Sequence, residues 1–184
     1  MWLTLKRHRD SRGTAATGID VEVARLPSGT LELKYRVSGI ISALRIPPQT
    51  APNRSDELWR HTCFEAFIRS PQSASYCELN LSPSLQWAAY RFTGYRDGMI
   101  VAPEVGPPRI EVNLHSAEFE LQASLEVGQL TSLPSNAAWH IGLSAVIEET
   151  SRDMSYWALA HPPGRADFHH PDCFAHTLPA TVTP

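Results

Sequence analysis

The sequence predicts an all-β protein, an antiparallel β-sandwich in which residues 1–184 form one domain. Apolar and polar residues alternate with a period of two through many short runs, which is the pattern of half-buried strands. Fifteen prolines and ten glycines separate these runs, and nothing longer than a turn or two has helical periodicity. Many short strands at this spacing indicate a sandwich or a barrel. No internal repeat or linker divides the chain.

The expected strands follow from the apolar alternation, which is clearest where Leu31, Leu33, Tyr35 and Val37 alternate with charged residues. In chain order we expect strands over residues 19–24, 31–37, 63–68, 76–81, 87–92, 110–114, 119–125, 139–147, 156–160 and 174–178. A turn at 26–29 should join the first two strands as a hairpin. A turn near Ser116 should join 110–114 to 119–125 in the same way.

Charge and hydropathy exclude several classes of protein. The net charge of -3 and the pI of about 6.2 lack the basic footprint of a nucleic-acid partner. No run approaches the 18 or more apolar residues of a membrane span. The apolar run at the N-terminus is broken at Lys6 and Arg7, too early for a secretory signal peptide. We therefore expect a cytoplasmic protein without a membrane association.

The three cysteines are Cys63, Cys77 and Cys173. An odd count without a CxxC spacing is typical neither of a disulfide framework nor of a zinc site. All three lie in apolar strand-like runs, where a cysteine acts as a small buried hydrophobe. We expect them to be buried and reduced, with Cys63 and Cys77 pointing to opposite faces of their sheet.

The expected hairpin of residues 63–68 and 76–81 carries the most information about function. A four-residue loop would set Glu65 opposite Glu78, and a slip of one residue would send every side chain to the wrong face. Matching the apolar residues places Phe64, Ala66, Ile68, Cys77, Leu79, Ala88, Tyr90 and Phe92 on a core face. The opposite face would then carry Glu65, Glu78, Asn80, Trp87 and Arg91. Two opposed glutamates repel each other, and Arg91 is their expected partner.

This polar face has three interpretations. It is a buried ion pair that steadies a half-covered sheet, a small-ligand groove with an aromatic wall, or a solvated outer face. Convergent polar groups beside aromatic side chains are the usual composition of a small-ligand site. The sequence alone leaves all three open.

Several segments resemble DOMON-like domains, which are relatives of the family 9 carbohydrate-binding modules. Residues 56–68 (DELWRHTCFEAFI) resemble the opening motif of these domains, and residues 76–83 (YCELNLSP) resemble the following strand. Residues 156–159 (YWAL) and 163–174 (PGRADFHHPDCF) resemble the closing loop and last strand. The similarity runs from about residue 18 to 178.

The resemblance implies a jelly-roll-like β-sandwich of bacterial origin that binds a small ligand without catalysis. Some members of the family hold sugars and others hold haem. We expect a carbohydrate or a sugar derivative, and neither a cofactor nor catalytic residues. The predicted ligand-binding residues are Trp59, His61, Glu65, Glu78, Asn80, Trp87, Arg91, Trp157 and His161. Among these, Trp59 or Trp87 should contact the ligand, while His61 and His161 should lie at the rim.

Four alternatives remain. A divalent metal would use His169, His170 and Asp167, although adjacent histidines in an extended segment point opposite ways. A haem would need axial ligands, yet Met99 and Met154 lie in expected turns. Glu65 and Glu78 could act as the carboxylate pair of a glycoside hydrolase, although one hairpin presents both from the same side of a sugar. The last alternative is a protein-interaction module that uses an edge strand.

Overall fold

Twelve strands and three short 3₁₀ helices form the fold of the computed structural model, which describes residues 1–181. The strands are β1 (Trp2–Arg7), β2 (Ala16–Arg25), β3 (Thr30–Gly39), β4 (Cys63–Arg69), β5 (Tyr76–Leu81), β6 (Trp87–Phe92), β7 (Ile100–Val101), β8 (Arg109–Leu114), β9 (Glu118–Glu126), β10 (Trp139–Glu148), β11 (Met154–Ala158) and β12 (His176–Leu178). The 3₁₀ helices are η1 (Ile41–Ala43), η2 (Leu58–Arg60) and η3 (Pro171–Cys173). Within residues 1–181, no helix is long and apolar enough to span a membrane.

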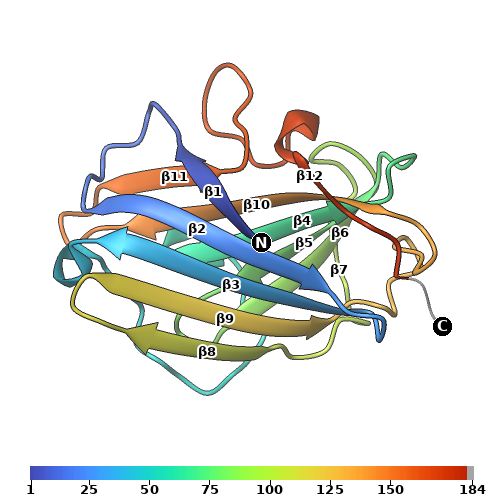
Figure 1. Cartoon of the computed structure of the whole chain (residues 1–184), viewed down its shortest axis with the longest axis horizontal. Coiled ribbons are helices and arrows are strands. Elements are labelled where there is room, and N and C mark those ends of the chain that lie inside the picture. Colours follow the sequence, from blue (N-terminus) through green and yellow to red (C-terminus); the bar gives the residue numbers. More distant parts are fainter. Residues whose placement is uncertain (182–184) are drawn as a thin grey trace.

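All strand pairings between these elements are antiparallel, and they form two packed layers (Figure 1). The hydrogen-bonded order is β7-β6-β5-β4-β10-β11-β1-β2-β3-β9-β8, with β12 added beside β10. One layer contains β2, β3, β9 and β8, and the other runs from β7 to β11. The strand β1 pairs with β2 in one layer and with β11 in the other. This arrangement confirms the predicted all-β antiparallel sandwich.

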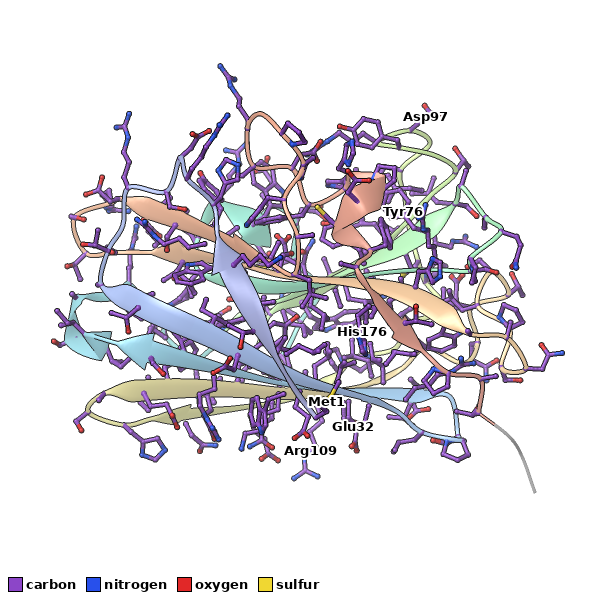
Figure 2. The ribbon with its side chains drawn as sticks, turned by 45° about the horizontal axis from the view of Figure 1, so that its top comes forward. Met1, Glu32, Tyr76, Asp97, Arg109 and His176 are labelled. Carbon is purple, nitrogen blue, oxygen red and sulfur yellow. The ribbon has the colours of Figure 1, made fainter. Side chains whose placement is uncertain are left out.

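The core lies between the layers, where side chains fill the space (Figure 2). Leu31, Leu33, Tyr35 and Val37 are buried as their alternation predicts. Tyr35 packs against Phe64 of the opposite layer with 4.8 Å between ring centroids, and its hydroxyl donates to the Glu65 carbonyl at 2.8 Å. Because that hydrogen bond crosses the core, it fixes how the two layers face each other.

The predicted elements agree with the structure in most places. Both hairpins are confirmed, and the first turns at Gly29, whose φ of 88° favours glycine. The burial of all three cysteines is also confirmed, and the structure gives them as free thiols. The strands β1 and β7 were not predicted, because β1 fully buries only Leu5 and ends in two charged residues, and β7 has only two residues. The predicted strand at 174–178 is shorter, because Phe174 caps the end of η3 and β12 begins only at His176.

The loop that contains η3 packs on the outer face of β10 at Gly142. A Cβ atom at this position would lie 2.8 Å from the Cys173 carbonyl oxygen. We expect Gly142→Ala to lower the free energy of unfolding by about 1–3 kcal/mol, because the backbone of the loop must move.

Gly18→Ala is the matched control, since Gly18 also lies in a strand and an added Cβ would meet nothing within 4 Å. Urea unfolding of both variants tests the contact. Equal unfolding midpoints for the two variants would mean that the loop does not pack closely against β10 at Gly142.

Candidate functional site

The outer face of the β4–β6 and β10–β11 layer is hollowed along one row of side chains. Glu65 of β4 pairs with Asn80 of β5 on one side and with Ser144 of β10 on the other. The row continues to Ala88 of β6 and Ala158 of β11. Because alanine and serine are small, the row leaves room above the sheet for a groove.

The groove has a volume of about 1540 Å³. Its walls are formed by the segments 56–60, which includes η2, 96–101, which ends in β7, and 165–169, together with the end of β10 and the start of β11. Its apolar and aromatic lining consists of Trp59, Tyr90, Phe92, Met99, Ile100, Val101, Val146, Met154, Tyr156, Ala166 and Phe168. Its polar lining consists of Asp10, Asp56, Glu57, Arg60, Glu65, Glu78, Arg96, Glu148, Arg152, Arg165 and His169.

Two buried carboxyl groups, those of Glu65 and Glu78, form the floor of the groove. Their residues are only 3% and 5% exposed. Ser144 donates to Glu65 Oε2 at 3.2 Å, and Asn80 donates to Glu78 Oε1 at 2.7 Å. Burial raises the pKa of Glu65 to about 8, with a further contribution from the charge of Glu78, while the Ser144 hydrogen bond and Arg96 oppose the shift. Burial also raises the pKa of Glu78, to about 7, against the Asn80 hydrogen bond. The pair therefore holds protons at a pH where exposed glutamates are ionised.

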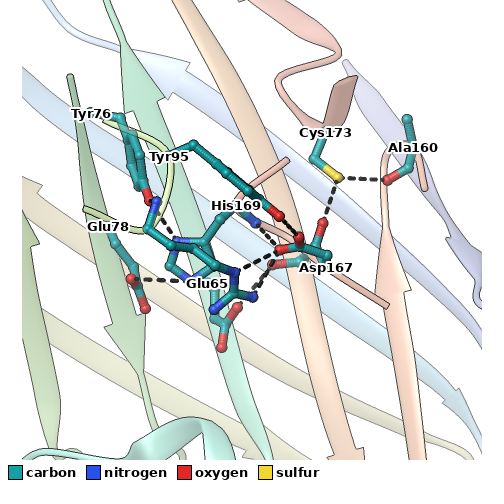
Figure 3. A network of polar contacts seen from close by, with 10 residues as sticks. Glu65, Tyr76, Glu78, Tyr95, Ala160, Asp167, His169 and Cys173 are labelled. Carbon is teal, nitrogen blue, oxygen red and sulfur yellow. Dashed lines mark hydrogen bonds and ion pairs between the residues drawn. The ribbon is translucent and has the colours of Figure 1, made fainter. Parts of the chain in front are cut away.

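His169 borders the floor and is neutral. One ring nitrogen, Nδ1, lies 2.7 Å from the Tyr76 hydroxyl, and Nε2 lies 3.8 Å from Glu78 Oε2 (Figure 3). Burial lowers the pKa of His169 to about 4, with a further contribution from the charge of Arg96. At neutral pH the imidazole is therefore no counterion for Glu78.

Asp167 anchors the loop that carries His169. It accepts hydrogen bonds from the Arg96 guanidinium at 2.8 Å, from the Tyr95 hydroxyl and from the His169 amide at 3.1 Å (Figure 3). Burial alone would raise the pKa of Asp167, but the hydrogen bonds from Tyr95 and Arg96 lower it. The Asp167 carboxylate therefore binds Arg96 and anchors the loop that carries His169.

Glu148, 4% exposed, forms a second ionic cluster in the wall. Its Oε1 accepts from Arg45 at 2.7 Å and from Arg152 at 3.1 Å, and its Oε2 lies 2.7 Å from His61 Nδ1. Glu148 thus has two arginine partners and an imidazole, whereas no lysine or arginine nitrogen of residues 1–181 lies within 4.0 Å of the two floor carboxyls.

The structure brings five of the predicted site residues to this face. Trp59, Glu65 and Glu78 line the groove, and Asn80 lies in its floor, where it holds Glu78. His61 is half exposed and joins the wall through Glu148.

The predicted register was wrong by two residues. Glu65 pairs with Asn80, and Glu78 pairs with Phe67, because the loop between the strands covers residues 70–75 and is longer than four residues. A shift of two preserves the face of every side chain, so Glu65 and Glu78 still share the outer face as diagonal neighbours.

The predicted face of β6 was also wrong. Trp87 lies in the core between the layers, while Tyr90 and Phe92 belong to the outer cluster with Ala88. Arg91 shares the face of Trp87 and pairs with Glu104 at 3.0 Å, so it is not the partner of the two glutamates. The apolar residues of β6 lie on both faces, and the outer aromatics line a groove instead of the core.

Two further predicted residues lie outside the groove lining. Trp157 lies in the core between the layers, where its indole N–H donates to the Ser155 hydroxyl at 3.0 Å. His161 Nε2 lies 2.8 Å from the Lys6 carbonyl, and its ring packs edge-on against His8.

Several lining residues were missed by the sequence reasoning. Tyr90 and Phe92 follow at once if Trp87 is assigned to the core, because alternate residues share a face. Arg96, Phe168 and His169 come from loops, which have no periodic signal. His169 drew attention only as a metal candidate.

The weak metal candidates do not converge on one point. Among residues 1–181, no three His, Cys, Asp or Glu side chains are grouped so as to hold a metal ion. Asp167 is engaged by Arg96 and Tyr95, and the His170 side chain accepts from the Asp172 amide at the start of η3. Met99, Met154 and His169 all line the groove, but His169 Nε2 faces Glu78 and so is poorly placed to ligate a haem iron.

No protein-family model matches the chain, and no curated protein matches it. Solved structures do match. A candidate carbohydrate-binding protein from Bacteroides uniformis superposes with a TM-score of 0.67 at 13% identity, over 94% of this chain and 83% of that one. A family 9 carbohydrate-binding module from Caldicellulosiruptor kristjanssonii gives a TM-score of 0.48 in complex with glucose, at 12% identity, over 88% of this chain and 76% of that one. A family 9 carbohydrate-binding module from the same organism in complex with cellotriose gives a TM-score of 0.48 at 13% identity, over 89% of this chain and 74% of that one. Among these three structures, the first has a TM-score above 0.5, and its similarity supports the sandwich fold.

Proposed function

We propose that the protein is a non-catalytic binding module whose ligand is a small carbohydrate or sugar derivative, held in the groove over Glu65 and Glu78. One observation carries the proposal: a groove of about 1540 Å³ combines a buried polar floor with aromatic walls and an exposed tryptophan at its mouth. Sugars suit such a site because their C–H faces pack on aromatic rings, while their hydroxyls pair with carboxyl and amide groups.

The similarity in fold to the Bacteroides uniformis protein supports this proposal. A relation to DOMON-like domains is part of it and rests on the motifs at 56–68, 76–83, 156–159 and 163–174.

Hydrolysis of a sugar by the carboxyl pair is the less favoured function. Glu65 and Glu78 project from neighbouring strands on the same face of one sheet. The acid and the nucleophile of a glycoside hydrolase must flank the scissile bond, and both floor carboxyls would meet a bound sugar from below.

Trp59 is the aromatic side chain best placed to stack on a sugar, because it lines the groove and is 48% exposed. We expect Trp59→Ala to weaken sugar binding about ten- to a hundred-fold while the thermal midpoint changes little. Titration calorimetry of the full chain with glucose and cellotriose measures the effect.

Trp2→Ala is the matched control, since Trp2 is a similarly exposed tryptophan on β1, outside the groove lining. Equal affinities for wild type, Trp59→Ala and Trp2→Ala would place the sugar elsewhere. No binding of mono-, di- or trisaccharides by the wild type would contradict the proposed function itself.

A further inference from the structure

The two floor carboxyls have no cationic partner among the described residues. Neither Glu65 nor Glu78 has a lysine or arginine nitrogen within 4.0 Å in residues 1–181, and the imidazole nearest to Glu78 is neutral. Glu65 Oε1 has no hydrogen-bond partner there either, while its Oε2 accepts from Ser144 alone. A buried carboxyl without a full set of partners is costly, and it favours a ligand that provides them.

Most of the positive charge in the groove is already paired elsewhere. Arg96 is held by Asp167 at 2.8 Å, Arg152 by Glu148 at 3.1 Å and Arg60 by Glu57 at 2.6 Å. These ion pairs lie in the walls. Within residues 1–181, the floor carboxyls are therefore acidic groups of the groove that lack a counterion, and Asp56, which accepts from the Tyr90 hydroxyl, is another.

Aromatic rings stand beside the floor. Tyr90 lies directly across from Glu78 on β6, and Phe92 follows two residues later on the same face. Tyr156 and Phe168 line the groove from β11 and the loop after it, with 6.5 Å between their ring centroids. Carboxylates combined with aromatic faces recognise organic ammonium groups, through ion pairs and through cation–π attraction.

We propose that the floor of the groove binds a protonated amine of the ligand, so that the preferred ligand is an amino sugar whose ammonium group contacts Glu65 and Glu78. This inference deepens the proposed function and rests on it for the sugar ring. A divalent cation is less suitable, because Glu65 and Glu78 are not joined by a third His, Cys, Asp or Glu in a metal-binding group among residues 1–181.

Binding of the amine should change the protonation of the floor. Several titratable groups lie around the two floor carboxyls or act on their protonation, directly or through His169. They are Cys63, Tyr76, Tyr90, Arg96, Glu148, Asp167 and His169. Burial holds the two carboxyls partly protonated without ligand, and an ammonium group favours their ionised form. The protein should therefore release protons when the amine binds, and a neutral sugar should release none.

The test compares three sugars of similar size at pH 6.5 by titration calorimetry with the full chain. We expect glucosamine to bind about ten- to a hundred-fold more tightly than glucose or N-acetylglucosamine. In two buffers of different ionisation enthalpy, only glucosamine should show proton release. The double substitution Glu65→Gln, Glu78→Gln keeps the shape of the floor and should abolish both the preference and the proton release.

Glu118→Gln is the control variant, because Glu118 lies on β9 of the other layer, outside the groove lining, and is paired with Arg36. It should keep the preference for glucosamine. Circular dichroism and the thermal midpoint check that each variant is folded.

The outcomes separate this inference from the proposed function. Equal affinity for all three sugars would overturn the proposed amine site but would still support carbohydrate binding in the groove. Binding of cyclohexylamine without binding of any sugar would support the amine site and overturn the carbohydrate proposal. No binding of sugars or amines would overturn both, and a preference lost on adding EDTA would assign the floor to a metal ion instead.

Discussion

Trp87→Ala is expected to lower the free energy of unfolding by about 3–5 kcal/mol, the usual effect of removing a large aromatic side chain from a core. Trp87 is 4% exposed and belongs to the cluster between the layers. The Arg54 guanidinium stacks 4.0 Å from its ring centroid and donates to the Ala89, Ala102 and Val105 carbonyls. Loss of the indole thus removes core packing and the surface on which Arg54 rests.

Urea unfolding measures this effect, and Trp59→Ala is the control because its indole is half exposed. The control should change the unfolding free energy by less than about 1 kcal/mol. A stable Trp87→Ala variant with weakened ligand binding would reverse the assignment, since that is the result expected if the indole faced the groove.

The second large effect concerns pH. The folded-state pKa values of Glu65 and Glu78 are raised above the ordinary value of 4.5, to about 8 and about 7. A raised carboxyl pKa means that folding takes up protons. The contribution of the two carboxyls to stability is therefore complete below about pH 4.5 and is lost as the pH rises through their folded-state pKa values. We expect the unfolding free energy to fall on the order of 2–4 kcal/mol between pH 5 and pH 8 relative to the double glutamine variant, since a tenfold change in a protonation equilibrium is worth about 1.4 kcal/mol.

Urea unfolding of wild type and of the Glu65→Gln, Glu78→Gln variant at four pH values measures this difference. Glu120→Gln is the control, because Lys34 and Arg36 lower the pKa of Glu120 on the other layer despite its burial. The control should therefore leave the slope between pH 5 and pH 8 unchanged. A difference between wild type and the double variant that is flat, or that grows toward low pH, would show that the floor carboxyls ionise freely.

The fold was predictable because its signal is local. Period-two alternation places Leu31, Leu33, Tyr35 and Val37 in the core whatever the rest of the chain does. The hairpin turn at Gly29 follows from residue chemistry alone. By contrast, β7 has two residues and the pairing of β1 with both layers joins segments far apart in sequence, so neither leaves a local pattern.

The candidate site was only partly predictable. Glu65 and Glu78 stood out because carboxylates interrupt apolar strands, and a register error of two left them on the correct face. The face of β6 was misjudged because both of its faces are apolar: Trp87 and Ala89 face the core, while Tyr90 and Phe92 face the groove. Periodicity cannot choose between two apolar faces. Loop residues such as Arg96 and His169 are placed by tertiary contacts alone.

Since β1 joins the two layers, the hydrogen-bonded path through residues 1–181 ends only at β7 and β8. The first of these edges is two residues long, and the second carries the exposed pair Arg109 and Glu111 along its outer side. Short and charged edges discourage the addition of a strand from another chain, which is the first step of ordered aggregation. Either end of the path therefore offers little free strand edge for a second chain, and the exposed apolar side chains Trp59, Met99, Ile100 and Val101 gather at the groove.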